Sequence, residues 1–120
     1  MHALDRARVL RKVADLGAIG DGQRLAAGDT KVAFQACDDS LADTGEWDEQ
    51  QCESNAQAYA ANTDVVGVIG TYNSGCAAIE IPILNEAADG GVAMISPGNT
   101  LVCLTEDSPS CDPEEPASFS

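Results

Sequence analysis

The chain has 120 residues, enough for one modest domain and too few for two lobes with separate hydrophobic cores. Apolar residues make up 44% of it, as in a globular protein, and 20 acidic against 6 basic residues give a net charge of −14. All six basic residues lie at or before Lys31. The lack of Lys and Arg beyond that point argues against nucleic-acid binding and against direct attachment to or insertion in a membrane.

Targeting signals and cysteine content point in different directions. Residues 1–6 are charged and lack the apolar core of a secretory signal peptide, and no apolar run is long enough to span a bilayer. Five cysteines nevertheless favour an oxidising compartment. Their spacing fits no zinc motif and the only histidine is His2, so neither a metal nor a cofactor is expected.

The first half of the chain predicts a helix, a loop, a strand and a second helix. Apolar residues recur at helical spacing from Ala3 to Leu16, with charges on the opposite face. Asp21-Gly22 and Gly28-Asp29 mark a loop. The apolar run 31–36 predicts a strand, and after a polar segment a helix is expected over about 49–61.

The second half predicts two strands around a helix. Residues 65–70 are apolar on both faces, which is typical of a strand covered on both sides. Ser74 is a suitable N-cap for a helix over roughly 75–88, which Pro82 should kink. Residues 92–95 predict the last strand, and the acidic segment 106–120, rich in Pro and Ser, a loop or tail.

This alternation predicts an α/β fold: a parallel sheet with helices on both faces. Only three strands are predicted, so the chain is expected to be part of a lobe rather than a complete one. In such sheets ligands bind beyond the carboxyl ends of the strands, where residues 70–75 and 96–100 form two polar, glycine-containing loops.

Neutral donors in these loops suggest a carboxylate-binding site. The hydroxyl groups of Ser74 and Thr100 and the N–H of Gly75 at a helix N-terminus can bind an anion without a cationic side chain. Phosphate is disfavoured, because Cys76-Ala77 stand where a P-loop needs Lys and Ser or Thr. The alternative is that Ser74 only caps the helix and Thr100 only closes a turn.

A thiol-dependent enzyme using Cys76 is a further alternative, because a helix N-terminus lowers a thiol pKa. No histidine except His2 could serve as its base, and the downstream carboxylates would raise the thiol pKa. A packing role for Cys76 is therefore favoured. The predicted disulfides, with Cys76 left over, are Cys37 with Cys52 and Cys103 with Cys111. The competing possibility is that all five cysteines are reduced.

Several stretches together resemble the type I periplasmic (solute-binding) proteins of ABC importers, and most closely their branched-chain amino-acid-binding branch. They lie within about residues 31–105 and comprise FQACDDS (34–40), GEWD (45–48), Cys52, VIGTYNSGC (68–76), EIPILN (80–85), MISPGNT (94–100) and Leu104-Thr105.

The resemblance implies two α/β lobes joined by hinge strands, with the ligand enclosed between them. Residues 31–105 would then be a partial first lobe with a flavodoxin-like strand order, between a poorly matched segment 1–30 and the tail 106–120. The family's opening strand, hinge and second lobe have no counterpart in the chain, so a fragment or a truncated paralogue is expected.

In amino-acid-binding members the first lobe holds the ligand α-carboxylate. The matching positions are Ser74 and the loop Gly98, Asn99 and Thr100, with Tyr72 and Asn73 as wall residues. The implied protein is extracytoplasmic and not an enzyme, and it would bind an amino acid and, as the full-length protein, a membrane permease. A ligand-sensing domain of the same fold in a receptor or regulator is the alternative.

Overall fold

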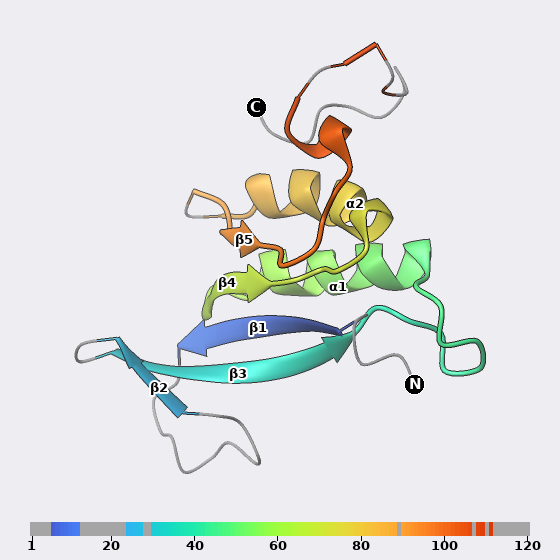
Figure 1. Ribbon diagram of the computed structural model, residues 1–120. Coiled ribbons are helices and arrows are strands. Elements are labelled where there is room, and N and C mark those ends of the chain that lie inside the picture. The colour runs from blue at the N-terminus through green and yellow to red at the C-terminus, as the bar shows by residue number, and fades with distance from the viewer. Residues whose placement is uncertain are drawn as a thin grey trace.

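A computed structural model of the protein describes residues 6–12, 24–27, 30–88, 90–106, 108–109 and 111, with their side chains from Val32 onward. Within these ranges two α-helices and a five-stranded sheet make an α/β fold, as predicted (Figure 1). The elements in chain order are β1 (Arg6–Lys12), β2 (Arg24–Ala27), β3 (Thr30–Asp38), α1 (Glu49–Ala61), β4 (Val65–Ile69), α2 (Ser74–Asn85), β5 (Met94–Ile95) and the 3-10 helix η2 (Val102–Leu104).

The sheet has the order β2-β3-β1-β4-β5 and is mixed rather than parallel. β1 runs antiparallel to both of its neighbours, β3 and β4, and β2 runs antiparallel to β3. Among the described strand pairs, β4 with β5 is parallel. β1 is antiparallel to both β3 and β4, so β3, β4 and β5 all run in the same direction. The predicted flavodoxin-like order is not matched in full, because β1, which lies between β3 and β4, runs against its neighbours, whereas the strands of a flavodoxin-like sheet are parallel.

β1 corrects the prediction of an N-terminal helix. Arg6–Lys12 pairs along its whole length with β3 and along most of it with β4. In that position its backbone supplies hydrogen-bond partners to two strands that would otherwise expose unpaired edges, a gain that outweighs local helix preference. β2 likewise lies inside the predicted loop, and residues 1–5 and 13–23 fall outside the described part of the chain.

The other predicted elements are confirmed with small shifts. α1 has the expected bounds, and the Asp48 carboxylate caps it by accepting a hydrogen bond from Gln51 N at 2.9 Å. α2 ends at Asn85, three residues beyond Pro82, and so is shorter than expected. No helix in the described ranges has the length and apolarity needed to cross a bilayer.

Both described helices lie on one face of the sheet, so the prediction of helices on both faces is wrong for them. The crossovers β3-α1-β4 and β4-α2-β5 step across the sheet in the same direction, and right-handed crossovers of that kind place their helices on the same side. α1 and α2 pack directly against each other there (Figure 1). The core between helices and sheet contains Tyr59, Val65, Val68 and Leu84.

The disulfides differ in part from those predicted. Cys103 pairs with Cys111 as expected, but Cys52 of α1 pairs with Cys76 of α2, with 5.5 Å between their Cα atoms. Cys37 is a free thiol that lines a cavity with Tyr59. Cys52 is not available to Cys37, because its sulfur is already bonded to Cys76 where α1 packs on α2.

We predict that the two disulfides contribute unequally to stability. Their sequence separations are 24 and 8 residues. In the chain-entropy model these loops correspond to about 3.5 kcal/mol for Cys52–Cys76 and about 2.6 kcal/mol for Cys103–Cys111. Urea unfolding of the two Cys→Ala double variants should show the larger loss of unfolding free energy for Cys52 with Cys76.

Cys37→Ala is the matched control, because it removes a cysteine side chain without removing a bridge. A larger loss from the Cys103 and Cys111 pair than from the helix pair would contradict the prediction.

Candidate ligand-binding site

Two loops meet at the carboxyl ends of the parallel strands β4 and β5. The loop after β4 leads into α2, and the loop after β5 leads towards η2. They start side by side, because Gly70 N donates to the carbonyl oxygen of Ile95 at 2.8 Å. Gly70 has a φ of 135°, a backbone conformation that favours glycine over other residues at this point.

Side-chain hydrogen bonds fasten the second loop to the first. Ser96 Oγ donates to the carbonyl of Thr71 at 2.7 Å. Asn99 Nδ2 donates to the carbonyls of Thr71 and Tyr72, each at 3.1 Å. Ser96 Oγ also accepts hydrogen bonds from the backbone N–H groups of Gly98 and Asn99, both at 3.2 Å. We call these contacts the loop junction, formed by residues 71–74 and 96–101.

The loop junction brings the two predicted hydroxyl residues together. Ser74 Oγ accepts hydrogen bonds from Thr100 N at 3.2 Å and from Leu101 N at 3.4 Å. Ser74 is half-buried and Thr100 is exposed. With the Ser74 oxygen lone pairs occupied, its O–H proton is the remaining hydrogen-bonding group and can be donated to an anion.

The helix cap is not the residue that the sequence suggested. Asn73 caps α2, because its Oδ1 accepts from Gly75 N at 2.8 Å and from Cys76 N at 3.4 Å, and Ser74 is the first helical residue. Asn is as good a cap as Ser and takes the role one position earlier. The Gly75 N–H, predicted to bind a carboxylate, is therefore already occupied by Asn73.

Two glycines of the site accommodate aromatic rings. A Cβ at Gly98 would lie 2.5 Å from the Tyr72 ring, and one at Gly75 would lie 2.7 Å from the Trp47 ring. Tyr72 is 46% exposed, so it covers Gly98 while presenting part of its ring to solvent. Gly98 and Asn99 consequently shape the loop junction, whereas Tyr72 and Thr100 are exposed beside it and Ser74 is half-buried.

The sequence did not single out Ser96 or Trp47 as site residues, although both lie in the stretches that resemble the solute-binding proteins. Ser96 directly precedes Pro-Gly-Asn, and a hydroxyl residue at that place commonly closes a turn by bonding to nearby N–H groups. The role of Ser96 could therefore have been predicted from the sequence. The contact between Trp47 and Gly75 joins segments far apart in the chain and had no local signal.

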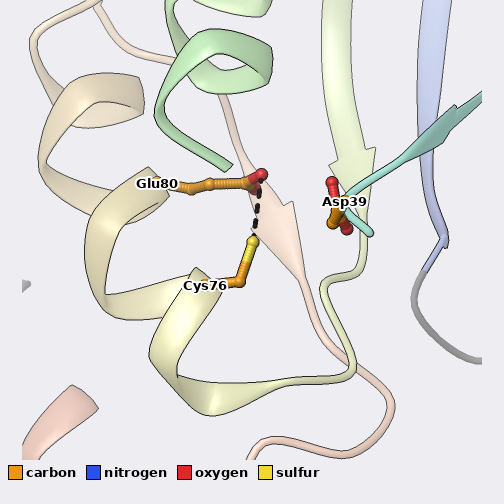
Figure 2. A group of neighbouring side chains, drawn as sticks. All are labelled: Asp39, Cys76 and Glu80. Atoms are coloured by element: carbon orange, nitrogen blue, oxygen red, sulfur yellow. Dashed lines mark hydrogen bonds between the residues drawn. The ribbon is translucent and has the colours of Figure 1, made fainter. Parts of the chain in front are cut away.

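A second group of polar side chains is buried between the helices and the end of β3. Glu80 and Asp39 are 0% and 1% exposed. Asn55 Nδ2 donates to Asp39 Oδ1 at 2.8 Å, and Glu80 Oε1 lies 3.7 Å from Cys76 Sγ (Figure 2). Burial raises the pKa of Glu80 to about 8, and the charge of Asp39 adds to the increase.

The sequence motifs did not single out Glu80 either, although it is a carboxylate between Ile79 and Ile81 in an apolar run. Because Cys76 Sγ is bonded to Cys52 and carries no proton, a protonated Glu80 is the donor in their contact. The same disulfide leaves Cys76 without the thiol that an enzyme would use.

Comparison with protein-family models, curated proteins and solved structures found no match to this chain. Next to the site, a cavity of about 270 Å³ is lined by apolar residues of α2, of the segment 92–94 and of η2, together with the polar side chains of Asn85, Ser96, Asn99 and Thr105. Ser74 and Thr100 do not line that cavity.

We predict that unfolding stability falls as the pH rises from about 4.5 to about 8, the ordinary and the folded-state pKa of Glu80. Folding favours the protonated form of Glu80. Its contribution to the unfolding free energy is therefore complete below the ordinary pKa and is lost as the pH rises through the folded-state pKa. Glu80→Gln mimics the protonated acid and should flatten this dependence in urea unfolding measured across the range.

Glu86→Gln is the control, because Glu86 is exposed at the end of the same helix. An equal change of slope in the two variants would contradict the assignment to Glu80.

Proposed function

We propose that this chain is part of the first lobe of a type I solute-binding protein and binds the α-carboxylate of an amino acid, without catalysing a reaction on it. The observation that carries the proposal is the hydrogen bond between Thr100 N and Ser74 Oγ, because it brings two predicted donor residues from separate loops into contact. Both loops follow parallel strands, the position at which ligands bind in open α/β sheets.

The chemistry of the loops suits a carboxylate better than a phosphate. Ser74 and Thr100 offer neutral O–H donors, and the N-terminus of the 12-residue helix α2 adds a partial positive charge. An ordinary carboxylate has one negative charge to balance, whereas a phosphate usually requires Lys or Arg, and the sequence has neither beyond Lys31. The exposed part of the Tyr72 ring is available to an aliphatic side chain of the ligand.

The proposed setting is extracytoplasmic. Two disulfides are typical of proteins in an oxidising compartment. In that setting the full-length protein would deliver a branched-chain amino acid to the permease of an ABC importer, as the resemblance in residues 31–105 implies. Closure of a second lobe would bury the rest of the ligand, so the chain by itself should bind weakly.

Nuclear magnetic resonance titration of the ¹⁵N-labelled chain tests the proposal with three ligands that differ by one group. L-Leucine and 4-methylpentanoate keep the carboxylate, and 3-methylbutylamine lacks it. We expect millimolar binding of the first two, seen as shifts of the Ser74, Thr100 and Leu101 amides, and no such shifts with the amine.

Matched variants locate the donors. Ser74→Ala and Thr100→Ala should each weaken leucine binding several-fold, because each removes one hydrogen bond to a charged group. Ser54→Ala and Thr63→Ala change the same residue types at exposed positions on α1 and before β4, and should leave binding unchanged. Equal shifts with the amine, or variants that bind like the unmodified chain, would contradict the proposal.

A further inference from the structure

The buried group between α1 and α2 has the composition of a metal site when its disulfide is open. Asp39, Cys76 and Glu80 each offer a ligand atom, and these atoms lie within 4.8 Å of one another. Cys52 Sγ adds a fourth donor, since it is bonded to Cys76 Sγ. The four residues come from α1, α2 and the segment after β3, so no short sequence motif could have predicted that they lie together.

The orientation of Glu80 is independent evidence for a cation between these side chains. Its side chain is completely buried and extends towards Cys76 and Asp39 (Figure 2). Glu80 Oε2 has no hydrogen-bond partner among the described residues. Native structures seldom leave a buried carboxyl oxygen unsatisfied, and a cation bound between the sulfurs and carboxylates would satisfy it.

We propose that, once a dithiol reductant opens the Cys52–Cys76 disulfide, the two thiolates and the carboxylates of Asp39 and Glu80 bind one thiophilic divalent cation of the zinc type. Zinc is bound in proteins by Cys thiolates and by Asp or Glu carboxylates, and four ligands closed off from water make a structural rather than a catalytic site. Calcium and magnesium are disfavoured, because they take six or more oxygen ligands and no thiolate.

The dimensions and the charge agree with that assignment. Zinc–sulfur bonds of about 2.3 Å and zinc–oxygen bonds of about 2.0 Å place tetrahedral ligand atoms roughly 3.3–3.8 Å apart. The donors need only small side-chain rotations to reach this spacing, because three of them already lie within 4.8 Å. Two thiolates, two carboxylates and a divalent cation leave a charge of about −2, the same as in four-cysteine zinc sites.

Opening of the disulfide and binding of the metal are two separate steps. The dithiol supplies two electrons and two protons, the S–S bond breaks to give two thiols, and the reductant becomes a cyclic disulfide. The cation then displaces the protons of both thiols and of Glu80 into solvent as the metal–ligand bonds form. Metal and disulfide exclude each other, so bound zinc should slow reoxidation of the pair.

Cobalt(II) titration tests the inference in a chain carrying Cys37→Ala, Cys103→Ser and Cys111→Ser, in which Cys52 and Cys76 are the only cysteines. Circular dichroism of its oxidised form checks that it folds. After reduction with dithiothreitol and removal of the reductant, one equivalent of cobalt should produce the absorption of a tetrahedral cobalt–thiolate centre. Zinc should abolish this absorption, and the oxidised chain should show none.

Carboxylate variants in the same background separate the proposed site from a simple pair of thiols. Glu80→Gln and Asp39→Asn should each weaken zinc binding by about 100-fold or more, whereas Glu86→Gln should not change it. Binding by the oxidised chain, no binding by the reduced chain, or carboxylate variants as tight as the parent would each overturn the inference.

Discussion

The hydrogen bonds of the loop junction are the constraint on which the candidate site depends. Parallel pairing of β4 with β5 starts the two loops side by side, and Ser96 and Asn99 then fix the second loop to carbonyls of the first. Only with this register does Ser74 reach the backbone of Thr100 and Leu101. Ser74 and Thr100, which are proposed to bind a carboxylate, are thus held together by neutral hydrogen bonds rather than by ion pairs.

The helix pair supports the loop junction from the other side. Cys76 lies two residues after Ser74, and its bond to Cys52 ties the first turn of α2 to α1. The Asn73 cap and the contact between Gly75 and Trp47 fix the same turn. Glu80, one turn further on, lies against the disulfide, so protonation of one buried carboxyl and the redox state of two cysteines both act on the helix that presents Ser74.

The elements that the sequence predicted well have strong local signals. α1 follows its Asp48 cap, and β4 is a β-branched run. β1 was misassigned, because its apolar residues also fit a helical period and its pairing with β3 and β4 is a long-range effect. The Cys52–Cys76 bond was missed for the same reason, since only the packing of α1 on α2 decides which cysteines meet.

Within the site, the positions were easier to predict than the roles. Ser74 and Thr100 do lie together, but Asn73, Gly75, Gly98 and Asn99 are used to build the loops. A cap one residue away satisfies the same N–H groups, so Ser74 and Asn73 were interchangeable on sequence alone. Which polar groups remain for a ligand depends on hydrogen bonds between segments more than twenty residues apart.

Amide hydrogen exchange at Thr100 and Leu101 tests the loop junction most directly. Both N–H groups should be protected in the unmodified chain, and Ser74→Ala should speed their exchange roughly fivefold, as loss of one neutral hydrogen bond implies. Exchange at Val92, whose N–H is bonded to Leu84, should stay unchanged. The account would be contradicted if the Thr100 and Leu101 amides were unprotected, or if their exchange rates were the same in the Ser74→Ala variant as in the unmodified chain.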